Sequence, residues 1–245
     1  ITRADRFDNC SDNEGHMPVI TLPDGTQKNY DQAVTAAQVA ADIGPGLAKA
    51  ALAARMGTAM IDLDLEIAED TDLSIVTSRD EDSLALLRHD AAHVMAEAVL
   101  ELYPETQVTI GPSIENGFYY DFYRETPFST EDLAAIETRM HEIVDRKEVI
   151  TREVWSRDQA VAFYKENNEP FKVELVDAIP ADETVTFYRQ GGFIDLCRGP
   201  HMPTTGHLGH AFKLMKVAGA YWRGDSNRPM LQRIYGTAFH NEKDL

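Results

Sequence analysis

The sequence predicts an α+β fold, with a small mixed unit first and a larger unit of helices and antiparallel strands after it. Three observations predict it. Short apolar or aromatic runs are bounded by turn residues, several segments carry helix-capping signals or a 3.6-residue apolar period, and strand-like runs dominate the later half. With 245 residues, 43% hydrophobic and 26% charged, the chain has the composition of one or two globular domains.

The first unit is predicted from a compact series of elements. A strand at 19–22, a Pro-Asp-Gly turn and a second strand near 27–30 precede a helix that we expect Asp31 to cap. That helix should end at the Gly-Pro-Gly of residues 44–46. A second helix is expected over 47–55, followed by strands over 60–67 and 73–77. These elements form a ββαβ-type unit that packs one helix on a small sheet.

The second unit is predicted to begin with a long helix over 83–102, which Pro104 closes. A hairpin follows over 107–123 around Glu115-Asn116-Gly117. Capping boxes predict two further helices, one beginning after Ser129 and one after Ser156, with an extended segment between them. Four strand-like runs complete the unit, at 171–176, 185–190, 193–197 and 211–222.

Charge and cysteine content exclude several classes of protein. The net charge of −18 argues against a general electrostatic grip on nucleic acid or anionic lipid, although residues 201–245 hold six basic and only three acidic side chains. Two cysteines far apart provide no disulfide framework, and no stretch approaches the roughly 20 apolar residues of a membrane span. We expect a soluble protein in a reducing, cytoplasmic setting. Residues 1–16 have no signal-peptide pattern and are interpreted as a disordered leader or a remnant of cloning.

Two histidine-containing motifs are the candidate chemistry. His89 and His93 are four residues apart on the predicted helix, so they lie on one helix face, and Glu97 continues the stripe. The apolar row of that helix lies on another side, so we expect these histidines outside the main core. For an isolated pair of this spacing a solvated or half-buried pair is the commoner explanation.

Cys197 and His201 repeat the spacing at a strand end that runs into a Gly-Pro turn, just after Asp195. A lone cysteine is more often a small buried hydrophobe. Together with His89 and His93, however, the pair supplies a set that could bind tetrahedral Zn²⁺ or equally hold a water and a carbonyl without metal. Composition does not choose between these two uses.

A third motif, residues 221–227, combines aromatic and basic side chains beside a turn. Trp222 and Arg223 are compatible with a base or ribose stacking on a ring while the guanidinium meets a phosphate. An ordinary hairpin with buried rings explains the run as well. Pattern alone does not place Lys172, Tyr188 or the aromatic run that contains Tyr119 and Tyr120.

Longer runs make a family resemblance visible. In order along the chain, MPVITLPDG, DIGPGLAKA, RHDAAHVMAEAV, IGPSIENGFYYDF, DLCRGPHMP and FKLMKVAGAYWRGDSNRPMLQRIYGTAF are similar to the N-terminal half of bacterial threonyl-tRNA synthetase. The resemblance covers about Met17 to Phe239. It implies a TGS-like β-grasp domain over 17–79, an editing domain over 80–240, and in 241–245 the start of a linker toward the aminoacylation core. Because the chain stops before that core, we expect it not to charge tRNA.

The resemblance implies an aminoacyl-tRNA deacylase that hydrolyses mischarged Ser-tRNA(Thr). It places the catalytic machinery at His89, His93, Lys172, Asp195, Cys197 and His201, and a pocket tyrosine at Tyr188. The other candidate substrate-binding side chains are Tyr119, Tyr120, Arg223 and Trp222. Asp195 should hold the substrate amino group or orient a water. Lys172 should bind the 3′-terminal adenosine or assist water activation.

The expected partner is the acceptor end of tRNA(Thr) carrying serine, with no membrane involved, and no metal is expected in the site. The alternatives are a zinc-binding hydrolase or structural module using His89, His93, Cys197 and His201, and a non-catalytic tRNA-binding or regulatory module. The chain is expected to be a monomer, although the parent enzyme of the family is a homodimer. One departure stands out, because Asp90 and Ala91 replace a Ser-Cys pair usual in the family, and an inward Asp90 would raise the pKa of His89.

Overall fold

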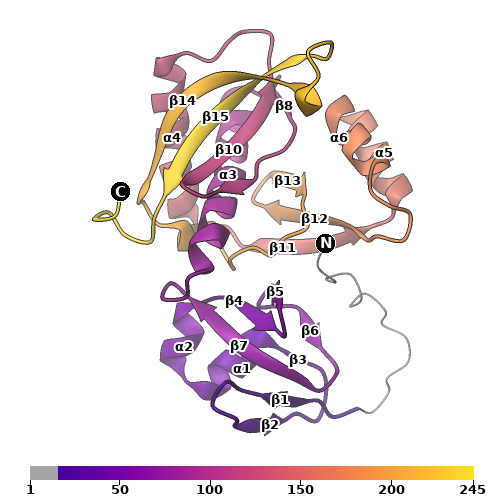
Figure 1. The fold of residues 1–245 in the computed structure, drawn as a ribbon, viewed down its shortest axis with the longest axis vertical. Helices are drawn as coiled ribbons and strands as arrows, with labels where there is room; N and C mark the ends of the chain where they lie inside the picture. Colours follow the sequence, from indigo (N-terminus) through magenta and orange to yellow (C-terminus); the bar gives the residue numbers. More distant parts are fainter. Residues whose placement is uncertain (1–15) are drawn as a thin grey trace. The chain divides into compact units, whose positions relative to one another are not determined.

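A computed structural model describes residues 16–245 and divides them into two compact units (Figure 1). The first runs to Ser83 and takes in the short segment Gly199–Pro203, and the second comprises Leu84–Arg198 and Thr204–Leu245. All but the last residue of the expected leader fall outside the described part. Both units contain helices and sheets, with a mixed sheet in the first unit and antiparallel sheets in the second, which confirms the α+β fold class.

The first unit is built on a five-stranded sheet with the order β2-β1-β7-β4-β5. Strands β1 (Val19–Thr21) and β7 (Thr71–Thr77) pair in parallel, and the other neighbours are antiparallel. Helix α1 (Ala36–Ile43) buries Val39 and Ala40 in one cluster with sheet residues such as Ile20 and Leu73. One helix packed on a mixed sheet with a parallel pair is the β-grasp arrangement. The other strands are β2 (Gln27–Asn29), β4 (Ala51–Met56) and β5 (Ala59–Ile61), with β3 (Val34–Thr35) and β6 (Glu66–Ile67) forming a separate antiparallel pair.

Two local expectations for this unit are wrong. The helix expected over 47–55 ends early, since α2 covers only Pro45–Ala50 and the next residues form β4. β4 pairs with β5 on one side and β7 on the other, and this pairing overrides the helix propensity of its three alanines. Asp31 does not cap α1. Thr35 does, because its side chain accepts from the Gln38 backbone N–H while the Gln38 side chain accepts from the Thr35 backbone N–H.

The second unit contains two sheets. In one, β14 (Phe212–Tyr221), β15 (Met230–Ala238), β10 (Gly117–Tyr123) and β8 (Gln107–Val108) are neighbours in that order, and β9 (Ser113–Ile114) pairs with the start of β10. The other has the order β11-β12-β13, formed by Ile150–Trp155, Val185–Gln190 and Phe193–Leu196. All these pairings are antiparallel.

Helices α3 (Ser83–Leu102), α4 (Thr130–Arg146), α5 (Arg157–Glu166) and α6 (Pro170–Asp177) complete the second unit. The capping boxes at Ser129 and Ser156 are both formed. The strand expected over 171–176 is instead α6, because Pro170 occupies its first turn, where a missing N–H costs nothing. β15 was not predicted, although it is a nine-residue strand paired with both β14 and β10. Within residues 16–245, no helix combines the length and apolar character needed to cross a bilayer.

Candidate active site

Helix α3 brings the first histidine pair together. The rings of His89 and His93 have centroids 4.9 Å apart, and the His93 ring meets Phe193 of β13 edge-on at 6.0 Å. His93 is only 4% exposed, so the expectation that this pair lies outside the core is wrong for His93. α3 is buried around most of its circumference, which leaves no solvent-facing side at this position.

Cys197 directly follows β13 and is held by the neighbouring strand. Its backbone N–H donates to the Thr186 carbonyl (3.1 Å), and the Thr186 hydroxyl donates to the Cys197 carbonyl (2.5 Å). These two bonds fix the backbone that carries the thiol. His89 Nε2 then lies 3.1 Å from Cys197 Sγ, within hydrogen-bond distance for sulfur.

His201 is four residues further along the chain and is 3% exposed. Its backbone N–H donates to Asp62 Oδ1 at 2.9 Å. Each member of the set His89, His93, Cys197 and His201 offers one ligand atom, and these four atoms all lie within 4.8 Å of one another. Three imidazoles and one thiolate are a donor set that suits tetrahedral Zn²⁺, so the residues present fit that ion.

Asp195, two residues before Cys197 in the chain, belongs to a buried group of three polar side chains. Lys172 of α6 forms an ion pair with Asp195 of β13, and the two residues are 1% and 2% exposed. The Tyr120 hydroxyl of β10 donates to Asp195 Oδ2 (2.5 Å) and accepts from Lys172 Nζ (3.2 Å). Three separate elements therefore converge on one closed hydrogen-bonded group.

This group of three side chains keeps Tyr120 protonated. Burial, followed by the neighbouring Asp195 carboxylate, raises the pKa of Tyr120 well above 10. The phenol therefore remains a hydrogen-bond donor at physiological pH. Such a group holds the carboxylate in one orientation.

Of the other predicted substrate-binding residues, Tyr188 lies beside Asp195, whereas Tyr119 points away from Tyr120 and its partners. Tyr188 of β12 is buried and sits opposite Asp195 in the antiparallel register, so both side chains project from the same face of the sheet. Tyr119 points to the other face of β10 from Tyr120. There its ring lies under the guanidinium of Arg233 (3.8 Å), which also pairs with Asp121 through two hydrogen bonds.

Trp222 and Arg223 are not brought to the histidine–cysteine set. Trp222 is 2% exposed, packs edge-on against Phe171, and donates its indole N–H to Glu174 Oε2 (2.8 Å). Arg223 lies 3.7 Å from the same carboxylate. The indole therefore has no free face for a base, and stacking on Trp222 is corrected to a packing role. The plain alternative considered above, a hairpin with buried rings, holds for Trp222, whereas Tyr221 of the same run is 43% exposed.

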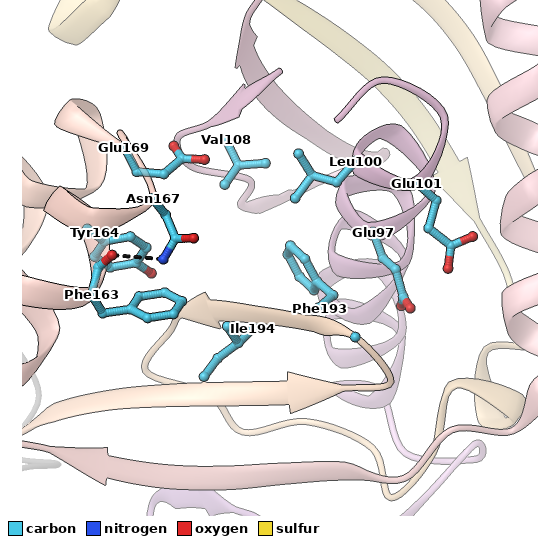
Figure 2. Close-up of a pocket in the computed structure, with 11 residues that line it drawn as sticks. Glu97, Leu100, Glu101, Val108, Phe163, Tyr164, Asn167, Glu169, Phe193 and Ile194 are labelled. Carbon is cyan, nitrogen blue, oxygen red and sulfur yellow. Dashed lines mark hydrogen bonds between the residues drawn. The ribbon is translucent and has the colours of Figure 1, made fainter. Parts of the chain in front are cut away.

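Two carboxyl groups beside the site were not predicted from the sequence as functional residues, one buried (Glu97) and one half-buried (Glu169). Glu97 was noticed only as the continuation of the histidine stripe; it accepts from the Gln190 side chain (2.7 Å), and burial raises its pKa to about 8. Glu169, on the segment between α5 and α6, carried no sequence signal at all. Burial likewise raises its pKa to about 8. Both residues line a cavity of about 350 Å³ in the second unit (Figure 2).

Comparisons with known proteins agree with the geometry. Residues 18–77 match the TGS domain, and residues 185–235 match the family described as the threonyl and alanyl tRNA synthetase second additional domain. The chain is 64% identical over 230 residues to a threonine–tRNA ligase of Paramagnetospirillum magneticum, and 61% and 59% identical over 229 residues to those of Rhodospirillum rubrum and Acidiphilium cryptum.

Each of these alignments covers 94% of the chain and 36% of the relative, so the chain spans about a third of the length of the curated relatives it matches. Two family matches at separate places and this level of identity along nearly the whole chain point the same way. The chain therefore carries a TGS domain and a threonyl and alanyl tRNA synthetase second additional domain, and along 94% of its length it is similar to the N-terminal region of bacterial threonine–tRNA ligases.

Proposed function

We propose that this chain is an aminoacyl-tRNA deacylase that hydrolyses the ester between serine and the 3′-terminal ribose of tRNA(Thr). The observation that carries the proposal is the convergence of four ligand atoms, from His89, His93, Cys197 and His201, within 4.8 Å. The match to the second additional domain of threonyl and alanyl tRNA synthetases supports an editing role for this site.

The need for such an activity follows from side-chain chemistry. Serine is threonine without one methyl group, and a pocket discriminates one methyl by only about 1–3 kcal/mol, or roughly 10- to 200-fold. A second site that admits the smaller product and rejects the larger one removes the remaining errors. The buried setting of His93 and His201 suits a cavity that measures a single methyl group.

The reaction requires few groups because an ester is already reactive. A water oxygen attacks the carbonyl carbon, the bond from that carbon to the ribose oxygen breaks, and the ribose oxygen takes a proton. An imidazole of His89 or His93 holds the water and accepts its proton, because imidazole is the side-chain group most often used as a general base. Asp195, fixed by Tyr120, is the anion for the substrate ammonium. No covalent intermediate is needed, and Cys197 lines the pocket.

Zinc is a second candidate because the donor set fits it. His89, His93, Cys197 and His201 would hold the ion, which would supply Lewis-acid polarisation of the ester carbonyl. We propose the metal-free form. Elemental analysis of the purified chain together with the deacylation rate after chelation distinguishes the two. Near-stoichiometric zinc with activity lost on chelation would replace the metal-free proposal by the zinc one.

The decisive assay compares Ser-tRNA(Thr) and Thr-tRNA(Thr) as substrates of the 245-residue chain. We expect hydrolysis of the seryl ester and sparing of the threonyl ester, with the His89→Ala rate reduced by about 10²-fold or more for loss of a general base. His210→Ala is the matched control, because His210 lies on the surface of the same unit and pairs with Asp145. Equal rates on both esters, or binding of tRNA with no turnover of either, would overturn the proposal.

The remaining parts of the proposal concern the setting of the reaction. We propose that the chain acts as a monomer in the cytoplasm on the acceptor end of tRNA(Thr). Sedimentation velocity of the purified chain over a range of concentrations tests the monomer directly. A species of twice the chain mass that persists on dilution would contradict it.

A further inference from the structure

Asp62 of the first unit carries a buried carboxyl group for which the reaction above has no role. It lies within the TGS match, directly after β5, and is 8% exposed. Its neighbours Ile61 and Leu63 both belong to the apolar core of that unit. A carboxyl group between two core residues loses most of its contact with water on folding, so its position requires a hydrogen-bond partner.

The backbone around Asp62 is held on both sides. Ile61 pairs with Ala54 of β4, and the Leu63 carbonyl accepts the Ala37 backbone N–H in the first turn of α1 (2.9 Å). A side chain that leaves so constrained a backbone has little freedom to move. It can therefore serve as a rigid support for a group that a reaction needs in one place.

The group that Asp62 supports is the backbone of His201. Asp62 Oδ1 accepts from the His201 N–H at 2.9 Å, and His201 is 3% exposed. Residues Gly199–Pro203 accordingly group with the first unit. The chain on either side is fastened within the second unit, where the backbone N–H groups of Cys197 and Thr205 each donate to a backbone carbonyl. The Asp62 carboxyl group thus acts on the middle of this segment, where His201 lies.

We propose that Asp62 is a positioning residue for the deacylase, which holds the His201 backbone and thereby fixes the His201 imidazole relative to His89, His93 and Cys197. The ligand atoms of these four residues lie within 4.8 Å of one another, so a small shift of His201 changes the geometry of the whole set. A misplacement of about 1 Å can cost up to about 10²-fold in rate. The inference rests on the proposed deacylase function, and it gives a residue of the TGS domain a part in that reaction.

Amide hydrogen exchange tests the contact without any turnover. In the 245-residue chain, Asp62→Ala should make the His201 amide exchange about tenfold faster, because its N–H loses its acceptor. Asp62→Asn should stay within about twofold of the wild type, since its side-chain carbonyl still accepts. The amides of Val39 and Ala40 in α1 should stay protected in both variants, which separates loss of this bond from unfolding of the first unit. If Asp62→Ala unfolds that unit, Asp62→Ser provides the same test, because its hydroxyl lies one bond short of the Oδ1 position.

Steady-state kinetics on Ser-tRNA(Thr) test the consequence for the reaction. Asp62→Ala should lower kcat about tenfold or more with KM within about twofold, because the bond acts on a reacting side chain and not on substrate binding. Asp62→Asn should restore kcat. Asp64→Ala is the matched control, since Asp64 lies two residues further along the chain with its side chain exposed, and it should behave as the wild type.

The outcomes separate this inference from the proposed function. Unchanged His201 exchange or unchanged kcat in Asp62→Ala would overturn the positioning role and leave the deacylase intact. An Asp62→Asn chain as slow as Asp62→Ala would do the same, because the hydrogen bond would then not be the cause. A wild-type chain that hydrolyses no ester would overturn the deacylase, and with it any part for Asp62 in that reaction, whatever the exchange at His201 shows.

Discussion

At the residue scale, the Lys172–Asp195 ion pair is sensitive to the loss of either partner. Both side chains are almost fully buried, and the Tyr120 hydroxyl forms a hydrogen bond with each of them. Removing one charge from such a pair leaves the other unpaired in a medium of low dielectric constant, which costs about 3–5 kcal/mol. The same pair therefore serves both the stability of the second unit and the proposed placement of the substrate ammonium.

We predict that Lys172→Met lowers the free energy of unfolding of the second unit by about 3–5 kcal/mol. The measurement is urea unfolding followed by the fluorescence of Trp155 and Trp222, both of which lie in that unit. In the double variant Lys172→Met/Asp195→Asn no buried charge remains, so much of the lost stability should return while deacylation stays impaired. A single variant as stable as the wild type would contradict the account of this pair.

The candidate residues differ in how far sequence could identify them. His89 and His93, like Cys197 and His201, have a spacing that allows a common ligand, and the structure brings the four ligand atoms together. Lys172 came only from the family resemblance, because its partners lie 23 and 52 positions away in the chain. No local pattern encodes a contact of that kind, and Glu169 was missed for the same reason.

At the element scale, local signals succeeded where a segment's own residues determine its conformation. The boxes at Ser129 and Ser156 start α4 and α5 as predicted. Local signals failed where pairing with residues distant in the sequence determines the conformation of a segment. Residues 51–56 have alanines that favour a helix, yet they pair with β5 and β7. β15 was missed because polar and turn-forming residues separate it from the strand-like run before it. In the structure β10 and β14 pair with it on its two sides.

The cap of α1 gives a matched pair of variants that tests this distinction. Thr35→Ala should weaken the first turn of α1 by about 1 kcal/mol, because the Gln38 N–H loses its acceptor. Asp31→Ala should have no comparable effect. Amide hydrogen exchange at Gln38 and the following residues should be about fivefold faster in the first variant only. Faster exchange in the Asp31 variant, with none in the Thr35 variant, would restore the cap first predicted from the sequence.

For the whole molecule, the acidic surface limits how strongly the chain can hold a polyanion. With a net charge of −18, repulsion opposes tRNA binding everywhere except at local basic positions. Several arginines are already paired, Arg233 with Asp121 and Arg228 with Glu174. We predict weak binding of uncharged tRNA(Thr), with the logarithm of the association constant falling only slowly as salt rises, in a filter-binding titration. A steep salt dependence typical of many phosphate contacts would contradict this.

The pH dependence of stability is the last prediction, and its sign follows from Glu97 and Glu169. Burial raises the pKa of each from 4.5 to about 8 in the folded chain. Between these values the folded state binds more protons than the unfolded state, so the free energy of unfolding falls as pH rises through about 8. The pKa of His141 is lowered from 6.5 by burial, and this acts in the opposite direction only below about pH 6.5.

Urea midpoints of the second unit should therefore decrease from pH 6.8 to 8.8. The decrease should persist in 0.5 M salt, which screens surface repulsion, and it should flatten in Glu97→Gln/Glu169→Gln. A midpoint that rises over this range, or a slope unchanged in the double variant, would show that these two carboxyls are ionised in the folded protein at neutral pH.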